Sequence, residues 1–91
     1  MDVQVEWDEE KARANVKKHA ITFAEAATVF LDPFLLTFPD DLHSDIEERF
    51  ISIGQSDRQR LILVVHTDRG TAIRIISARK PTAKERITYE Q

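Results

Sequence analysis

The fold is decided by residues 61–78, which read LILVVHTDRGTAIRIISA. Two runs rich in β-branched residues, Leu61–Thr67 and Thr71–Ala78, are typical of strands. Asp68-Arg69-Gly70 lies between them and places a glycine where a three-residue hairpin loop needs a left-handed backbone. The stretch therefore predicts a tight β-hairpin.

The register of this hairpin decides which side chains share a face of the sheet. If Thr67 lies opposite Thr71, one face of the hairpin is wholly apolar, and we expect the N-terminal helices to cover it. This face would hold Leu63, Val65, Ile73 and Ile75, joined by Ile51 and Ile53 of the neighbouring strand. His66 and Arg74 would then lie diagonally on the other face, in an open groove. A slip of one residue would exchange the two faces and bury the Arg74 charge.

The rest of the chain carries clear start and stop signals. Asp8 is a typical helix N-cap, and the pairs Thr22 with Glu25 and Thr82 with Glu85 have the spacing of capping boxes. The expected elements are a first strand with Val3, Val5 and Trp7, a helix at Glu9–His19, a helix from Thr22 that ends at Asp32-Pro33, strands at Phe34–Phe38 and Arg49–Gly54, the hairpin, and a short helix to Glu90. Residues 39–47 are expected to form a solvated acidic loop.

These elements follow the order β-α-α-β-β-β-β-α. The order predicts a single α+β domain over residues 1–91, with a mainly antiparallel sheet, two N-terminal helices packed on one face, and a short C-terminal helix. A domain of this size has a small core, so we expect it to gain stability from a partner. The chain has no cysteine, which excludes disulfides and thiolate zinc sites and favours a reducing, cytoplasmic setting. We expect neither a signal peptide nor a membrane span.

Charge is distributed unevenly along the chain. Residues 58–91 contain eight Lys or Arg against three acids, whereas the remainder contains five against thirteen. The overall charge of −3 therefore conceals a cationic end, which is what a small protein needs to contact a phosphate backbone.

Several motifs together carry a family resemblance. They are EWDxxKAxxNxxKH at residues 6–19, ITFxEA at 21–26, Asp32-Pro33, ERFxxIG at 48–54, RIISAR at 74–79 and ERxxYE at 85–90. With these motifs the chain resembles the BrnT toxins of bacterial type II toxin–antitoxin pairs over nearly its whole length. Ala20 departs from the pattern, because BrnT-like sequences usually carry glycine there.

The resemblance implies a compact RelE-like fold and an endoribonuclease that stops translation by cutting RNA. It also implies neutralisation by a BrnA-type antitoxin, whose ribbon-helix-helix part binds DNA. By analogy, two toxins would assemble around an antitoxin dimer, and the complex would repress its own operon. The toxin itself would meet DNA only through the antitoxin.

RNA cleavage without a metal or other cofactor requires proton transfer and stabilisation of charge on the phosphate. Arg74 and Arg79 are the candidates for charge stabilisation, because a guanidinium is a planar fork of donors. His66 is the candidate for proton transfer, and Tyr89 for stacking on a base or donating a hydrogen bond. Contacts to the RNA backbone are assigned to Lys80, Lys84 and Arg86.

Each candidate also has an ordinary structural explanation. Arg74 could pair with an acid such as Glu48, Arg79 could pair with Glu85, and Tyr89 could be a core residue. Lys18 and His19 are explained by the dipole at the end of their helix. His43 lies among Asp40, Asp41 and Asp45, a group that superficially suggests a metal site but matches no ligand spacing.

Two other functions are open from the sequence. The chain could be a non-catalytic module that binds a DNA-binding partner and acts as a co-repressor. It could also bind nucleic acid in its own right, although the net charge of −3 argues against this because duplex binding usually requires a broader basic surface.

Overall fold

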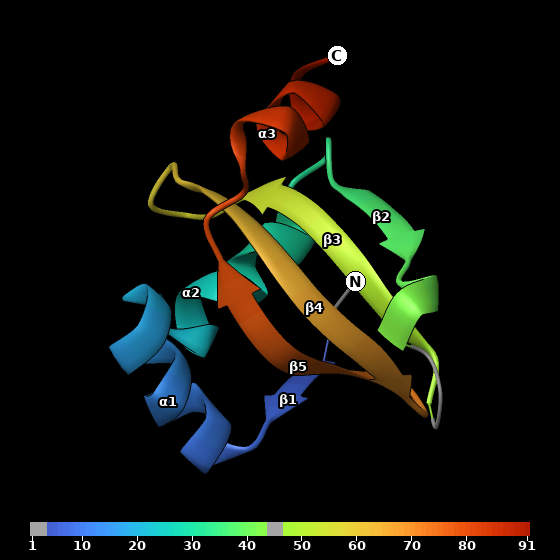
Figure 1. The fold of residues 1–91 in the computed structure, drawn as a ribbon. Helices are drawn as coiled ribbons and strands as arrows, with labels where there is room; N and C mark the ends of the chain where they lie inside the picture. Colours follow the sequence, from blue (N-terminus) through green and yellow to red (C-terminus); the bar gives the residue numbers. More distant parts are fainter. Residues whose placement is uncertain (1–3, 44–46) are drawn as a thin grey trace.

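The computed structural model describes residues 4–43 and 47–91, which form a five-stranded sheet with helices at one face, one edge and one end (Figure 1). The strands are β1 (Gln4–Trp7), β2 (Leu36–Pro39), β3 (Arg49–Gln55), β4 (Leu61–Arg69) and β5 (Ala72–Arg79). The helices are α1 (Glu9–His19), α2 (Phe23–Ala27) and α3 (Ala83–Glu90), with 3-10 turns η1 (Thr28–Leu31) and η2 (Asp41–His43). Val3, which the sequence placed in the first strand, lies outside the described residues.

The sheet order is β1-β5-β4-β3-β2, and every neighbouring pair is antiparallel except β1 with β5. The α+β class and the mainly antiparallel sheet are therefore confirmed. No helix among residues 4–43 and 47–91 is long and apolar enough to span a membrane.

Local capping explains where the helices begin and end. Asp8 accepts a hydrogen bond from the Lys11 backbone, and α1 ends at Ala20 in a left-handed conformation with φ of 59°. At α3 both halves of the predicted capping box are present. At α2 the box is only half formed: Thr22 accepts from the Glu25 backbone, but the Glu25 carboxylate points elsewhere. The carboxylate instead accepts hydrogen bonds from Arg60 and Ser56.

The register predicted for the hairpin is wrong. Strand β4 continues two residues further than predicted, β5 begins and ends one residue later, and Gly70-Thr71 alone joins them, with Gly70 at φ of +62°. Thr67 consequently lies opposite Arg74, and His66 lies opposite Ile75. Because side chains alternate along a strand, this odd-numbered shift places His66 and Arg74 on opposite faces of the sheet.

A bulge in β5 then changes which face its later residues occupy. Val65 lies opposite Ser77 while His66 lies opposite Ile75, so Ile76 is the extra residue. After the bulge, Ala78 returns to the face of Ile75, whereas Ser77 and Arg79 lie on the opposite face. Without it, Arg79 would point toward the helices.

One face of the sheet packs against α2 and η1 and contains the main core. The core cluster consists of Ile21, Phe23, Ala26, Val29, Ile62, Val64, Ile75 and Ala78. Trp7 packs edge-on against Phe23 with ring centroids 6.1 Å apart, which closes this core near β1. The expected positions of Ile73 and Ile75 are thus confirmed, but Leu63, Val65, Ile51 and Ile53 lie on the other face. We call that other face the open face.

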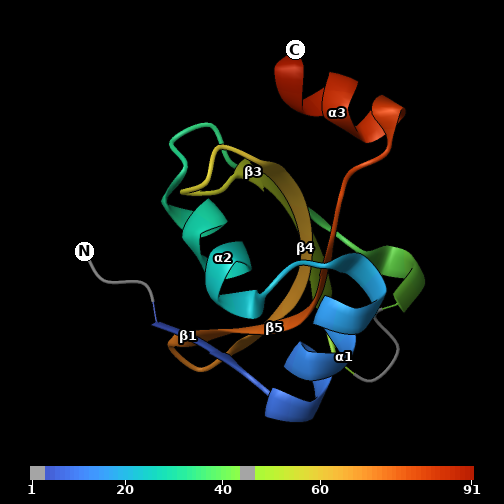
Figure 2. The ribbon, with the colours of Figure 1, turned by 90° about the vertical axis from the view of Figure 1, so that its left-hand side faces the viewer.

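Helix α1 does not cover a face of the sheet, as had been expected, but lies along the edge of β5 (Figures 1 and 2). Strand β1 pairs only with residues 72–75 of β5, which leaves the backbone of residues 76–79 without a strand partner at this edge. The buried Asn15 side chain satisfies this edge: its Nδ2 donates to the Ala78 carbonyl at 2.9 Å, and its Oδ1 accepts from the Ala78 amide at 3.0 Å. A single amide therefore substitutes for a strand partner.

Candidate nucleic-acid interface

His66 is buried on the helix-covered face, with 4% of its surface exposed. Its Nε2 shares a 2.7 Å hydrogen bond with Ser52 Oγ, which in turn bonds Thr37 Oγ1 at 2.7 Å. Its Nδ1 has no hydrogen-bond partner among the described residues. The imidazole is therefore held in a short chain of hydroxyl groups rather than presented to solvent.

The walls around His66 are largely aromatic. Phe30 packs edge-on against the ring at a centroid distance of 5.0 Å, and Phe50 stacks at 5.8 Å. Burial lowers the pKa of His66, and the nearby charge of Asp68 opposes this only in part. We call this surface depression of about 310 Å³ the aromatic hollow.

Arg74 lies on the open face, so the predicted groove with His66 does not exist. Arg74 Nη1 donates to Glu6 Oε2 at 2.8 Å, and 31% of the arginine side chain is exposed. The sequence had offered an ion pair with an acid such as Glu48 as the ordinary explanation for Arg74. The ion pair exists, but its acid is Glu6 of β1.

Arg79 and Tyr89, also predicted to be catalytic, both hold α3 in place. Arg79 donates through Nη1 and Nη2 to the two carboxylate oxygens of Glu85, at 2.9 and 3.0 Å. These hydrogen bonds lower the pKa of Glu85 to about 2. Tyr89, one helical turn after Glu85, donates to Asp32, and burial together with this bond raises the pKa of Tyr89 to about 12. The two contacts attach α3 to β5 and to the end of η1.

Arg79 also lines a hollow between α1 and β5 with a volume of about 430 Å³. Lys11, Lys18 and His19 of α1 line the same hollow, and within the described residues no acidic side chain contributes to its wall. We call these four residues the cationic hollow. Arg79 keeps 38% of its side chain exposed there, despite its pairing with Glu85.

The position of α1 explains how these side chains meet. Lys11, Lys18 and His19 lie four before, three after and four after Asn15, so they occupy one helical face with it. Because Asn15 bonds the backbone of Ala78, this face turns toward Arg79, the next residue of β5. A helical asparagine at this spacing was one signal for this cluster in the sequence, but the helix dipole alone accounted for Lys18 and His19.

A second hollow of about 410 Å³ adjoins the first on the open face and shares Ile76, Ser77 and Arg79 with it. Its floor is aliphatic and includes Ile51, Leu63 and Val65. We call it the apolar hollow. His43 lies at its rim and is bonded through Nδ1 to Asp40 at 2.9 Å.

The predicted acidic loop is therefore only partly solvated, because Asp40 is buried. Asp45 lies outside the described residues. In the part of the chain that the structure describes, no group of three His, Cys, Asp or Glu side chains is placed to hold a metal ion.

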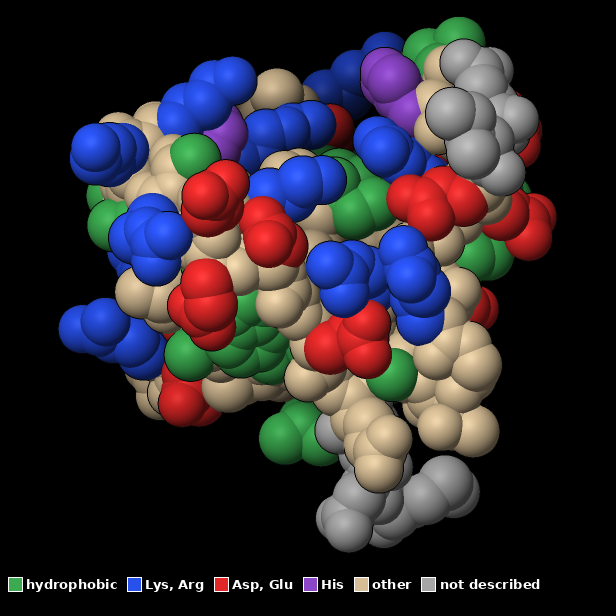
Figure 3. Space-filling model, turned by 90° about the horizontal axis from the view of Figure 1, so that it is seen from below, with side chains coloured by type: hydrophobic (Ala, Val, Ile, Leu, Met, Phe, Trp, Pro, Cys, Tyr) green, Lys and Arg blue, Asp and Glu red, His purple; other side chains and the backbone are tan. Residues whose placement is uncertain are grey.

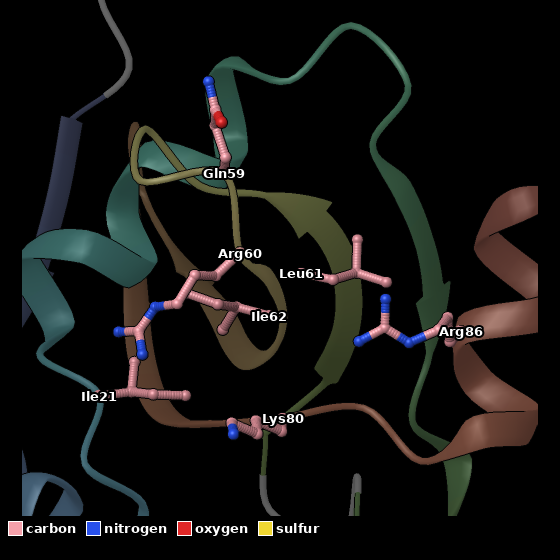
Figure 4. A pocket seen from close by; sticks show the side chains of 7 residues that line it. All are labelled: Ile21, Gln59, Arg60, Leu61, Ile62, Lys80 and Arg86. Atoms are coloured by element: carbon pink, nitrogen blue, oxygen red, sulfur yellow. The ribbon is translucent and has the colours of Figure 1, made fainter.

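The structure brings two of the predicted backbone-contacting residues together. Lys80 and Arg86 converge with Arg60 around a pocket of about 250 Å³, whose floor is Ile21, Leu61 and Ile62 (Figure 4). We call Arg60, Lys80 and Arg86 the three-cation pocket. Lys84 is exposed on α3 but does not line it.

Basic and acidic side chains share the wider surface. Seen from below in Figure 3, Lys and Arg side chains are interleaved with Asp and Glu side chains. Histidine side chains lie in the upper part of that view, beside Lys or Arg side chains.

Comparison with protein families assigns the chain. Residues 7–85 match the family described as the ribonuclease toxin BrnT of type II toxin–antitoxin systems. The chain belongs to the BrnT family. This membership agrees with the resemblance carried by the sequence motifs, and it implies an antitoxin partner.

A solved BrnT structure supports the same assignment. The 1.1 Å crystal structure of the Brucella abortus ribonuclease toxin BrnT superposes with a TM-score of 0.69 at 26% sequence identity. The match covers 89% of this chain and 99% of the Brucella chain. A comparison with curated proteins found no match.

For a BrnT-family ribonuclease, the cationic hollow offers the functions that phosphodiester cleavage requires. Arg79 supplies a guanidinium, His19 an imidazole, and Lys11 and Lys18 two ammonium groups. The aromatic hollow offers one buried imidazole, and no Lys or Arg side chain of the described residues lines it.

Proposed function

We propose that this BrnT-family chain is an endoribonuclease that cuts RNA without a metal ion and that its active site is the cationic hollow. The observation that carries the proposal is the presence of four basic side chains around one open hollow, with no acidic side chain of the described residues in its wall. Such a hollow attracts a phosphate, and its arginine can stabilise the additional charge of the transition state.

The chemistry uses groups that the hollow already contains. His19 takes the proton from the ribose 2′-hydroxyl, whose oxygen attacks the adjacent phosphorus. The bond from phosphorus to the 5′-oxygen breaks, leaving a 2′,3′-cyclic phosphate on one product and a 5′-hydroxyl on the other. Lys11 and Lys18 are the donors available to protonate the departing oxygen, and Arg79 binds the non-bridging oxygens.

The roles predicted for the other residues stay predictions. His66 lies on the opposite face from Arg79, and Arg74 lies five positions earlier on β5, roughly 16 Å away along an extended strand. Neither shares a hollow with Arg79. Tyr89 contributes to the proposal by holding α3, and Lys80, Lys84 and Arg86 contribute as contacts to the RNA backbone.

In the cell, the proposal extends to inhibition of translation in the cytoplasm by cleavage of RNA. Neutralisation would come from a BrnA-type ribbon-helix-helix antitoxin in an assembly of two toxins and two antitoxins. Family membership supports an antitoxin partner. The specific antitoxin, its stoichiometry and the RelE-like ancestry rest on the resemblance of the motifs.

The test is to incubate the purified chain, free of partner, with RNA in the presence of EDTA. We expect cleavage that leaves 2′,3′-cyclic phosphate ends, and a loss of about 100-fold or more in Arg79→Gln. Arg58→Gln is the matched control, because Arg58 is exposed, lies in the β3–β4 turn and lines none of these hollows. Circular dichroism would verify that both variants are folded.

Two results would contradict the proposal. If EDTA stops cleavage and a divalent cation restores it, the reaction requires a metal ion, which contradicts the proposal. Intact RNA at every protein concentration, combined with altered operator binding when the chain joins its antitoxin, would favour the non-catalytic co-repressor.

A further inference from the structure

Two consecutive residues at the end of β5 line hollows that lie on different sides of the sheet. Arg79 lines the cationic hollow on the open face, and Lys80 lines the three-cation pocket beside Ile21 and Ile62, which belong to the main core. A nucleic-acid strand that crosses the end of β5 would therefore meet both hollows, one after the other.

Arg60 is held in place before any ligand arrives. Its Nε and Nη2 donate to the two carboxylate oxygens of Glu25, which is buried and also accepts from Ser56 Oγ at 2.7 Å. The hydrogen bonds from Arg60 lower the pKa of Glu25 to about 2, so the pair stays charged at neutral pH. Arg60 Nη1 makes no hydrogen bond within the described chain and is available to another acceptor.

Arg86 is positioned by the start of α3. Thr82 and Glu85 form the capping box, and Glu85 also binds Arg79, so the first turn of α3 is fixed against the end of β5. Arg86 follows Glu85 directly, and its guanidinium extends toward Leu61 at the rim of the pocket (Figure 4).

The charge of the pocket suits a single phosphate. Three cations line it, and Glu25 neutralises Arg60, whereas Lys80 and Arg86 form no ion pair with any described residue. Its floor is aliphatic, and among the described residues no aromatic ring lines it on which a base could stack. Phosphodiester groups carry one negative charge and accept several hydrogen bonds, as this set of donors requires.

We propose that the three-cation pocket binds a second phosphate of the same RNA strand whose scissile phosphate occupies the cationic hollow. This inference rests on the proposed function and adds to it a path for the substrate, across the carboxyl end of β5. The pocket anchors the strand and takes no part in bond cleavage.

The test measures binding rather than cleavage, so it reads out even if the chain does not cut RNA. A short oligonucleotide with 2′-O-methyl ribose throughout lacks the attacking hydroxyl and reports affinity by fluorescence anisotropy. The variant is the pair Lys80→Gln with Arg86→Gln, which leaves the buried Arg60–Glu25 contact intact. The control pair is Lys17→Gln with Arg58→Gln, which removes the same charge from exposed positions that line no hollow described above.

We expect the pocket variant to bind about tenfold more weakly at moderate salt than the control pair. The slope of log K against log salt should be shallower by about 0.7 in the pocket variant, as for the loss of one phosphate contact to a single strand. Replacing one phosphodiester at a time by an uncharged methylphosphonate should identify a linkage that matters in the control and not in the pocket variant.

Equal affinity and equal salt slope for the two double variants would overturn the inference, and so would an unchanged methylphosphonate profile. Those outcomes would leave the proposed ribonuclease untouched, because that proposal is judged by the Arg79 variant in the cleavage assay. Conversely, if the chain does not cleave RNA but shows the expected binding pattern, the proposed ribonuclease activity is rejected and the phosphate site in the three-cation pocket is supported.

Discussion

The cationic hollow and the aromatic hollow differ in charge and in how deeply the histidine of each is buried. Four basic side chains line the cationic hollow, and no acidic side chain of the described residues does. The aromatic hollow contains the buried imidazole of His66, whose lowered pKa favours the neutral form, beside Phe30, Phe50 and Asp68. Both contain a residue that the sequence marked as catalytic. A chemically suitable side chain is therefore a weak guide to a site, and the face of the sheet on which it lies decides its environment.

The largest expected effect distinguishes the two histidines as candidates for proton transfer. We expect His19→Gln to lower the cleavage rate by about 100-fold or more, as for the loss of a general base. His66→Gln should lower it only slightly, because His66 is far from Arg79 and on the other face. Single-turnover cleavage rates across pH decide the matter: a strong loss in His66→Gln with a folded protein would reverse the assignment.

The next largest effect concerns the residue that assembles the cationic hollow. Asn15→Ala should destabilise the fold by about 3 kcal/mol, because it leaves the buried amide and carbonyl of Ala78 without partners. Chemical denaturation measures this loss, and Arg13→Ala in the same helix is the exposed control, expected within about 0.5 kcal/mol of the parent. Equal stability of the two variants would show that α1 docks without Asn15.

The aromatic hollow should make stability depend on pH. Burial lowers the pKa of His66 below its usual 6.5, so under more acidic conditions the unfolded chain binds a proton that the folded chain excludes. The contribution of His66 is therefore complete above about pH 6.5 and is lost as pH falls toward the lowered pKa.

Denaturation at a series of pH values between 7 and 5 tests this, with His66→Gln as the variant that cannot titrate. The depressed carboxyl pKa values of Glu25 and Glu85, each about 2, affect stability only in more acidic solutions. The parent should lose stability relative to His66→Gln over this interval. Parallel curves would show that His66 is accessible to protons in the folded state.

The smallest effect is expected at α3, which polar contacts attach to Arg79 of the cationic hollow and to Asp32 after η1. Tyr89→Phe removes the hydrogen bond to Asp32 and should cost about 1 kcal/mol or less, because α3 has no buried residue. Hydrogen exchange should show faster exchange confined to residues 83–90. Faster exchange that extends into β5 would mean that α3 supports the sheet more than its contacts indicate.

Much of the fold was predictable because it depends on short-range physics. The N-cap at Asp8 and the capping box at Thr82 act over three or four residues, and both were correctly placed. For the same reason, the predicted ends of the strands lie within about two residues of the observed ends. Glu25 shows the limit of this reasoning. Its spacing from Thr22 is that of a capping box, but its carboxylate bonds Arg60, thirty-five positions away.

The site was less predictable, because it depends on register. The segment Leu61–Val65 is apolar at every position, so alternation could not reveal which side chains face the helices. The loop length was misjudged by one residue, and the bulge at Ile76 has no sequence marker such as glycine. Each of these features moves side chains from one face to the other.

The helices and strands, their order, the cationic end and the resemblance to the BrnT family could all be read from the amino-acid sequence. They could be read there because propensity, capping and motif spacing are properties of neighbouring residues. Tertiary structure alone decided that His66 is buried and that His19, through Asn15, lies in the same hollow as Arg79. The physical reason is that register and helix docking are set by burial and hydrogen bonds summed over residues far apart in the chain, and no local pattern carries that sum.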